Sequence, residues 1–275
     1  RCTFTANQCS TGDGGALYYF LDNNVSGSLV INRCVFDNNT SLNNSGGAVG
    51  IGIQGRATAT TSAIAITRSS FTANKANKGN GGAIFISNGF EPGNNALVQF
   101  NRFAGNTAQN AATTGLAMVN AAGNVVAANN WWGANSGPAA GPADRAALTG
   151  TGGTGTLTAT PYLVQNTTVT QSTLCNFGTS TSTVVTTGIT TNNLGNAIAV
   201  ADRIALSGLP VAFTFSGGSL ANTQVALDAN AQATTTYNAA LVGPATVLGR
   251  VDNVPTNDAS AVALTIRQAA TITTQ

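Results

Sequence analysis

The sequence predicts an all-β protein in which a parallel β-helix of about four to five coils precedes a β-sandwich. Three observations carry this prediction: two short motifs recur through the first 110 residues, their recurrence has a nearly fixed period, and the pattern changes after about Pro161. A period of about 33 residues is typical of stacked, near-identical units. We expect residues 1–140 to form the helix domain, 141–160 a Gly/Thr-rich linker in which Thr156–Ala159 can pair as a short strand, and 161–275 the sandwich.

The first motif is Phe-x-x-Asn, which occurs four times at spacings of 32, 35 and 32 residues. In stacked coils, equivalent residues lie above one another at the strand spacing of about 4.8 Å. We therefore expect an internal ladder of phenylalanine rings and a ladder of asparagine side chains that bond to one another. The predicted members are Phe4, Phe36, Phe71 and Phe103, with Asn7, Asn39, Asn74 and Asn106.

The second motif is Gly-Gly-Ala plus an aliphatic residue, ten residues after each of the first three phenylalanines. Paired glycines suit a bend where φ is positive or where backbone approaches backbone. Short β-like runs such as Ala16–Leu21, Ser28–Ile31 and Arg33–Phe36 alternate with Asn/Gly/Ser turn clusters, which is typical of strands joined by turns. In the fourth repeat Thr114-Gly115-Leu116 replaces the motif, so the repeat degenerates towards its end.

Together the two motifs resemble the repeats of chlamydial polymorphic outer membrane proteins and related bacterial β-helix adhesins, over residues 1–116. Asn129–Gly133, followed by Asn135-Ser136-Gly137-Pro138, resembles the Asn-x-Trp-Gly…Gly-Pro element that closes many bacterial right-handed β-helices. The resemblance implies a right-handed helix whose last coil is covered by Trp131 and Trp132, since a solenoid needs an atypical terminal unit. Carbohydrate stacking by the two indoles is the functional alternative.

Beyond Pro161 the chain shows period-2 alternation with turn signals, which favours a β-sandwich. Leu209–Thr214, Gly217-Gly218 and Asp228–Tyr237 resemble bacterial Ig-like domains of the invasin type, although Ala231 stands where that family usually has glycine. The resemblance implies a spacer or adhesive module. The expected strands are Thr181–Thr186, Val211–Phe215, Thr223–Leu227, Ala233–Tyr237, Ala245–Val251 and Ala261–Ile266.

Composition argues against several functions. Charged residues make up 7% of the chain and the net charge is +2, which gives no field for steering nucleic acid. No apolar run approaches the length of a membrane span. Histidine and Cys-x-x-Cys pairs are absent, which removes the usual general base and zinc signals. We expect an extracellular or cell-surface protein without cofactor or metal.

Catalysis by clustered carboxylates is the remaining enzymatic possibility, because many β-helix proteins act on acidic polysaccharides. The helix region offers five acidic residues, and none of them repeats at the coil spacing with another: Asp13, Asp22, Asp37, Glu91 and Asp144. We therefore predict no catalytic residues and keep a polysaccharide-active enzyme as an alternative.

The cysteines give a geometric prediction. Cys2 and Cys34 each precede a ladder phenylalanine by two residues. Stacking would bring their Cα atoms to about 4.8 Å, within disulfide range, so we predict that they are bonded; two buried thiols are the alternative. Cys9 and Cys175 belong to the two ends of the predicted architecture, and we propose a disulfide between subunits for this pair.

The two ends of the sequence suggest association. Arg1 lies three residues before the first ladder phenylalanine, and the alternating segment Ala269–Thr274 follows the last predicted strand. An open coil edge is a template for strand pairing. The sequence thus predicts a non-enzymatic structural protein that assembles head to tail into a filament or sheath. The alternative is a fragment of a surface adhesin that binds a surface or matrix ligand.

Overall fold

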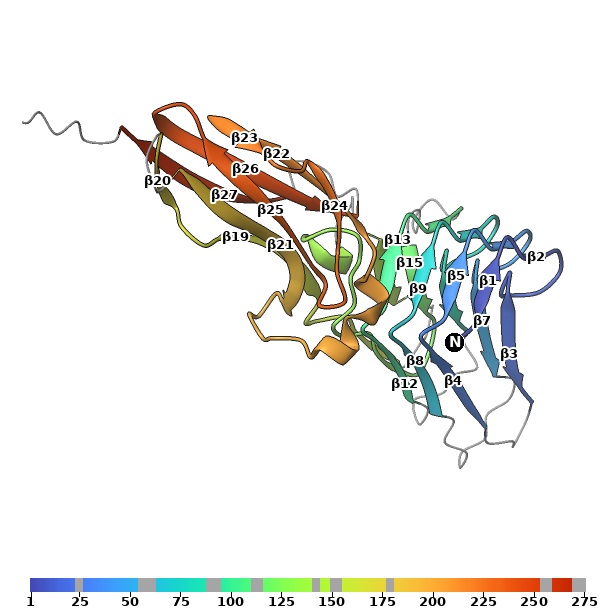
Figure 1. Cartoon of the computed structure of the whole chain (residues 1–275). Helices are drawn as coiled ribbons and strands as arrows, with labels where there is room; N and C mark the ends of the chain where they lie inside the picture. The colour runs from blue at the N-terminus through green and yellow to red at the C-terminus, as the bar shows by residue number, and fades with distance from the viewer. Residues whose placement is uncertain are drawn as a thin grey trace, which may run out of the picture. The chain divides into compact units, whose positions relative to one another are not determined.

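Figure 1 shows the computed structural model, in which the chain divides into two units. The first unit contains Arg1–Leu163 and Asn192–Asn196, and the second contains Val164–Thr191 and Ala197–Gln275. The structure describes residues 1–22, 27–53, 63–87, 95–109, 116–139, 144–148, 155–176, 181–252 and 259–268. In these ranges the elements are strands and three short 3-10 helices, η1 (Gly137–Ala139), η2 (Val200–Asp202) and η3 (Ile204–Leu206), so the predicted all-β class is confirmed.

The first unit is a parallel β-helix, as predicted, in which each complete coil gives one strand to each of four parallel sheets. The first coil contains β1 (Thr3–Thr5), β2 (Gln8–Cys9), β3 (Leu17–Leu21) and β4 (Ser28–Asn32). The second contains β5 (Val35–Asp37), β6 (Thr40–Ser41), β7 (Val49–Ile53) and β8 (Ala63–Thr67). The third contains β9 (Ser70–Thr72), β10 (Lys75–Ala76), β11 (Ile84–Ile86) and β12 (Asn95–Gln99). The fourth contains β13 (Arg102–Ala104), β14 (Thr107–Ala108), β15 (Leu116–Asn120) and β16 (Asn124–Val126).

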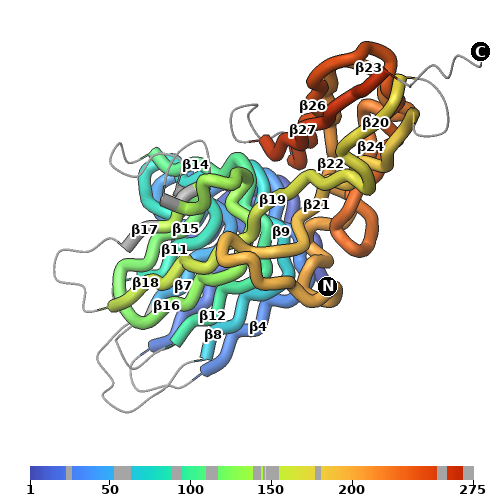
Figure 2. Tube along the Cα trace, turned by 90° about the vertical axis from the view of Figure 1, so that its left-hand side faces the viewer, coloured from blue at the N-terminus to red at the C-terminus, as the bar shows by residue number. Residues whose placement is uncertain are grey.

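A fifth, partial coil occupies much of the range predicted as a linker, and this corrects the prediction. Strand β17 (Arg145–Leu148) pairs with β15, and β18 (Thr156–Thr158) pairs with β16. Figure 2 shows β4, β8, β12, β16 and β18 following one another in a single sheet. The Gly/Thr composition suggested a flexible connection, but backbone pairing to the fourth coil needs no particular side chains. The edge that β15 and β16 would otherwise leave is thereby covered.

The Gly-Gly-Ala motif bends the backbone before the third strand of each coil. Its first glycine lies in the left-handed region, with φ of +75°, +68° and +65° at Gly14, Gly46 and Gly81. Its second glycine lies against the next coil, because a Cβ on Gly47 would overlap the carbonyl oxygen of Gly82. The two positions therefore need glycine for different reasons, one conformational and one steric.

The second unit is a β-sandwich, as predicted. Its first sheet has the order β19 (Leu163–Val169), β21 (Ser182–Asn192), β25 (Gln232–Ala239) and β23 (Gly218–Leu220). Its second sheet has the order β20 (Thr173–Cys175), β27 (Ser260–Arg267), β26 (Gly243–Val251), β22 (Pro210–Phe215) and β24 (Gln224–Ala226). All six predicted strands are present. The replacement of the family's glycine by Ala231 suggested a different turn, but Ala231 has a left-handed φ of +55°.

Strands β19, β20 and β23 were not predicted, and β19 shows why. Gln165 and Thr167 occupy inward positions of β19 and are buried. The backbone N–H of Val251 donates to Oε1 of Gln165 at 2.8 Å, and Oγ1 of Thr167 lies 2.8 Å from Oγ1 of Thr187. Hydrogen bonds thus satisfy the buried polar groups of this strand. Because polar residues occupy its inward positions, the strand lacks the alternation of hydrophobic and polar residues by which strands are recognised in sequence.

We expect Gly47→Ala to destabilise the first unit far more than Gly105→Ala. Gly105 has φ +70° with nothing within 4 Å of a built Cβ, so alanine adds only backbone strain there, roughly 1 kcal/mol. At Gly47 the new Cβ meets backbone, which has no flexible end to move, and the cost should be ~3 kcal/mol or more. Urea unfolding followed by tryptophan fluorescence measures both, because the two tryptophans lie in the first unit. Equal losses of stability in the two variants would show that the backbone around Gly47 can move to accommodate a Cβ.

Candidate functional site

The aromatic ladder is present as predicted and extends one residue further. Ring centroids are 4.7 Å apart for Phe4 and Phe36, 4.8 Å for Phe36 and Phe71, and 5.2 Å for Phe71 and Phe103. Trp132 then stacks on Phe103 at 4.6 Å with an interplanar angle of 12°. The last four of these side chains are completely buried, so the ladder runs along the centre of the β-helix core.

Trp132 continues the aromatic ladder into the fifth coil. It follows Phe103 at a shorter interval than any between the phenylalanines, yet it occupies the same place in its coil as they do in theirs. An indole covers more of the preceding ring than a benzene ring would. Because its face is stacked on Phe103, Trp132 has no free face there for a sugar. Trp131 is also buried, and its backbone pairs with Arg102 of β13.

The predicted amide ladder has a direction. The backbone N–H and the Nδ2 group of each asparagine both donate to the Oδ1 atom of the next, at 2.9–3.0 Å, from Asn7 to Asn39, Asn74 and Asn106. The Nδ2 groups also reach back to the previous coil, as from Asn74 to the carbonyl oxygen of Phe36 at 3.0 Å. Each interior asparagine therefore joins three successive coils.

Asp144 ends this ladder, a role that the sequence did not reveal. Asn106 donates to Oδ2 of Asp144 from its backbone N–H at 3.0 Å and from Nδ2 at 2.6 Å. An ionised carboxylate accepts hydrogen bonds and donates none, so the series of donors stops here. Burial raises the pKa of Asp144 to about 6, against the lowering effect of these hydrogen bonds. The interval from Asn106 to Asp144 is longer than any between the ladder asparagines, and this hid the relation.

A second polar ladder, also unpredicted, lies two residues before the aromatic one. Asn101 donates from its backbone N–H and from Nδ2 to Oδ1 of Asn130, at 2.9 and 3.1 Å. Ser69 donates its N–H to Oδ1 of Asn101 at 2.9 Å, and Cys34 donates its N–H to Oγ of Ser69 at 3.0 Å. Positive φ precedes the four asparagines of the first ladder, at Ala6, Asn38, Ala73 and Gly105. It also precedes Cys34, Ser69, Asn101 and Asn130 of the second, at Arg33, Arg68, Phe100 and Asn129.

The cysteine prediction is correct in register but not in bonding. Val35 donates its N–H to the carbonyl oxygen of Cys2 at 2.9 Å, so Cys2 lies over Cys34 as expected. All four cysteines are nevertheless free, and Sγ of Cys34 accepts the backbone N–H of Cys2 at 3.4 Å. The sulfur thus takes the acceptor position of the second ladder instead of forming a disulfide. Cys9 belongs to the first unit and Cys175 to the second, and both are free thiols.

The outer edges of β1 to β4, here called the first-coil edge, face no other described strand. Phe4 is only half-buried and Asn7 is exposed, whereas their counterparts in later coils are buried. Within the described residues, no group donates to Oδ1 of Asn7, the atom that accepts two hydrogen bonds in each interior asparagine. In Asn39, Asn74 and Asn106 the equivalent oxygen accepts two hydrogen bonds from the preceding coil.

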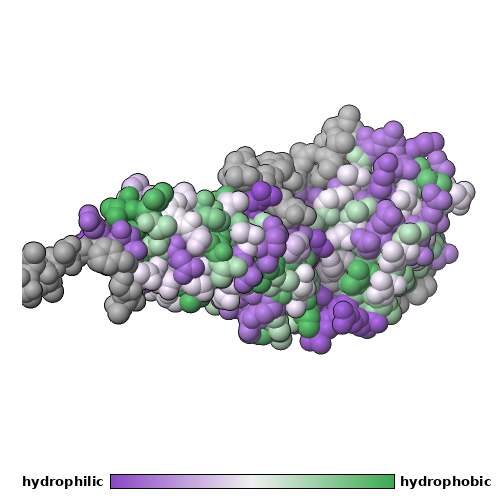
Figure 3. All heavy atoms as spheres, turned by 45° about the horizontal axis from the view of Figure 1, so that its top comes forward, coloured by the Kyte–Doolittle hydropathy of each residue, from purple (hydrophilic) through white to green (hydrophobic). Residues whose placement is uncertain are grey.

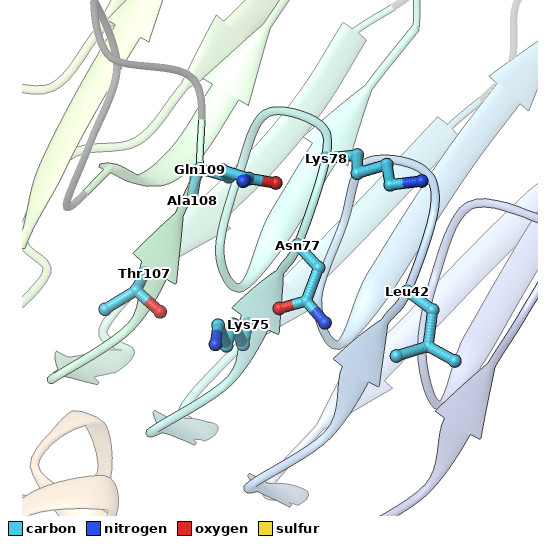
Figure 4. A pocket seen from close by; sticks show the side chains of 7 residues that line it. All are labelled: Leu42, Lys75, Asn77, Lys78, Thr107, Ala108 and Gln109. Carbon is cyan, nitrogen blue, oxygen red and sulfur yellow. The ribbon is translucent and has the colours of Figure 1, made fainter.

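A groove of about 700 Å³ crosses the second, third and fourth coils on the side of β6, β10 and β14 (Figure 4). We call it the lysine groove, because it contains both lysines of the chain. Residues from successive coils line it in register. Lys75 pairs with Thr107, and backbone hydrogen bonds of Asn77 and Gln109 continue the pairing of the coils beyond the ends of the strands. The lining residues are Leu42, Lys75, Asn77, Lys78, Thr107, Ala108 and Gln109.

The candidate carboxylates of the first unit are spread over several coils. Asp13 and Asp22 lie in the first coil, Asp37 in the second and Asp144 in the fifth, while Glu91 lies outside the described residues. Burial raises the pKa of Asp13, and the N–H of Ser45, which donates to its Oδ1 at 2.9 Å, opposes that rise. In the part of the chain that the structure describes, no three His, Cys, Asp or Glu side chains gather closely enough to hold a metal ion.

The described residues include no helix that could span a membrane. On the face drawn in Figure 3, hydrophobic and hydrophilic residues are interspersed over both units. Among the described helices, none has the length and apolar character needed to cross a bilayer.

Comparisons with known proteins leave the family open. No family model matches the sequence, and no curated protein matches it. Three solved structures of intimin are similar at a TM-score of 0.29: its D0–D1 domain (17% identity, 38% of this chain, 47% of that one), its D00–D0 domain (15%, 45%, 54%), and a C-terminal fragment in complex with the intimin-binding domain of the translocated intimin receptor (18%, 38%, 32%). The matches span about half or less of those chains. Similarity at this level indicates no function or partner here, so the resemblance of the repeats to polymorphic outer membrane proteins stays a prediction.

We expect the stability of the first unit to fall as pH rises from about 4 to about 7. The folded pKa of Asp144, about 6, lies above the ordinary value of 3.8. The protonated form therefore favours the folded state, and its contribution is complete below the unfolded pKa and lost as pH rises through the folded one. The difference between these two pKa values corresponds to about 3 kcal/mol in the free energy of unfolding. Urea unfolding across this range, followed by tryptophan fluorescence, should show this loss in the wild-type protein but not in Asp144→Asn; superimposable curves would contradict it.

Proposed function

We propose that this chain is a non-enzymatic extracellular structural protein that assembles head to tail, coil upon coil. The observation that carries the proposal is the way in which coils bind one another: strands of adjacent coils pair in register, and each interior asparagine accepts two hydrogen bonds from one coil and donates to the next. Exposed strand edges are templates for pairing with another chain. A contact between two different surfaces that does not close on itself extends into a fibre.

A second copy of the chain supplies the other half of the contact in this proposal. The segment 269–274 alternates in the manner of a strand, although it lies outside the described residues, and a tail of this kind can add to one edge of the neighbour by strand addition. Cys9 lies in β2, at the first-coil edge. A disulfide to Cys175 of the neighbouring copy would then lock the contact.

The positions of the repeating residues support a role without catalysis. The residues that repeat along the first unit are buried in the two polar ladders and the aromatic ladder, where they hold coils together. The acidic residues of the first unit do not recur at the coil spacing, so the repeat itself does not stack the pair of carboxyl groups that hydrolysis of a glycosidic bond needs. An adhesin fragment that displays a ligand site on the same rigid helix is the second candidate, favoured by the lysine groove.

Phe4→Glu should abolish assembly, whereas Val30→Glu should leave it intact. Phe4 would stack on a ring of the neighbouring copy, and a carboxylate there would be buried against an apolar surface at high cost. Val30 points outward from β4 and is 71% exposed, so it tests whether an added charge alone has an effect. Negative-stain microscopy and sedimentation at increasing concentration measure assembly, and tryptophan fluorescence checks the fold.

Two results would refute assembly through this edge. One is a wild-type protein that remains a monodisperse monomer at high concentration. The other is a Phe4→Glu variant that is folded and forms the same filaments as the wild-type protein. A truncated chain that ends at residue 268 examines the tail separately: filaments of unchanged length distribution would remove the tail from the contact and leave the first-coil edge.

A further inference from the structure

The lysine groove combines features of an anion site. Lys75 and Lys78 are exposed, and neither ammonium group has an ion-pair partner among the described residues. No carboxylate is among the described residues that line the groove. The chain has only two lysines, and the fold brings both to the same hollow. Two unopposed cations in a concave surface attract and hold negative charge more strongly than they would on a convex one.

The backbone makes this site rigid. Asn77 donates its N–H to the carbonyl oxygen of Ser41 at 2.8 Å, and Gln109 donates its N–H to that of Ala76 at 3.0 Å. Lys75 is held between Thr40 and Thr107 by strand pairing on both sides. Three coils therefore fix the spacing of the groove's polar groups before any ligand arrives. A preorganised site loses less entropy on binding than a flexible loop does.

The neighbours of the lysines indicate the chemical class of the ligand. Asn77 and Gln109 offer amide donors and Thr107 a hydroxyl, which suit carboxylate, sulfate and hydroxyl oxygens. Leu42 supplies an apolar surface at one end, and Figure 4 shows these side chains distributed along successive coils. The described residues of the groove include no aromatic side chain, whereas proteins that bind single-stranded nucleic acid combine a basic groove with aromatic rings on which the bases stack. The ligand is thus rich in anionic and hydroxyl groups and poor in flat rings.

We propose that the lysine groove binds an anionic polysaccharide, through its carboxylate or sulfate groups. The chain of sugars lies along the helix axis and crosses the second, third and fourth coils. Lys75 and Lys78 neutralise the acidic groups, and the amides and the hydroxyl bind sugar oxygens. The described lining of the groove begins in the second coil and includes no residue of β1 to β4, so each subunit of an assembled filament would carry one such site, and binding does not depend on assembly.

Binding of the full 275-residue chain to immobilised heparin, polygalacturonate and neutral dextran tests the proposal. Heparin carries mainly sulfate and polygalacturonate only carboxylate, so the two polymers identify which group is preferred. We expect binding to at least one of them and none to dextran. The affinity should fall as salt is added, because each contact between a lysine and an acidic group is screened.

Charge-matched variants decide whether the groove is the site. Lys75→Gln with Lys78→Gln should weaken binding roughly tenfold, as two exposed ion pairs would. Arg1→Gln with Arg267→Gln removes the same charge from exposed positions outside the groove and should change the affinity less than twofold. Lys75→Arg with Lys78→Arg keeps the charge and should keep most of the binding.

Three outcomes would overturn the proposal. Failure of the wild-type protein to bind either acidic polymer at low ionic strength excludes an anionic polysaccharide. Equal losses in the two charge-matched double variants would mean that net charge, and not the groove, is responsible. Tighter binding to single-stranded DNA than to either polysaccharide, lost in Lys75→Gln with Lys78→Gln, would assign the groove to nucleic acid instead. Tryptophan fluorescence confirms that each variant is folded before binding is compared.

Discussion

The Oδ1 atom of each interior ladder asparagine accepts two hydrogen bonds from the coil before it, and this pair of bonds fixes the register of the β-helix. Asn39, Asn74 and Asn106 are buried, so their amides would be costly to leave unpaired, and the coils are held where every amide is satisfied. In that register the phenylalanine rings stack and the second glycine of each pair meets a carbonyl group. A slip of one residue along a strand would turn inward side chains outward.

Features that repeat at the coil period were predictable from the sequence. The phenylalanine and asparagine ladders follow from spacings of 32 and 35 residues, because the period alone states which residues are stacked. The lysine groove obeys the same period: Leu42, Asn77 and Gln109 are separated by 35 and 32 residues. Applying the period to the residues that follow the Phe-x-x-Asn motif would have placed these three side chains together. It would not have shown that the surface between them is hollow.

What the sequence concealed lies where the period changes. Trp132 follows Phe103 too closely, and Asp144 follows Asn106 too distantly, to match the spacing of the earlier repeats, so neither is found by counting. Strands β17 and β18 bind by backbone pairing and carry no motif. Cys34 illustrates another limit: its register was predicted, but its sulfur accepts a backbone N–H instead of bonding to Cys2. The repeat period predicts which residues are stacked, whereas the bonds that a stacked residue makes depend on its neighbours.

The free energies of unfolding of Asn74→Ala and Asn7→Ala, compared by urea unfolding with tryptophan fluorescence, test most directly whether the amide ladder holds the coils. Asn74 is completely buried and its side chain joins the second, third and fourth coils, so its loss strands buried donors and should cost ~3 kcal/mol or more. Asn7 is exposed and its side chain donates only to Asn39, so its loss should cost about 1 kcal/mol. Similar, small losses at both positions would contradict the account, because the register would then be set by the aromatic core alone.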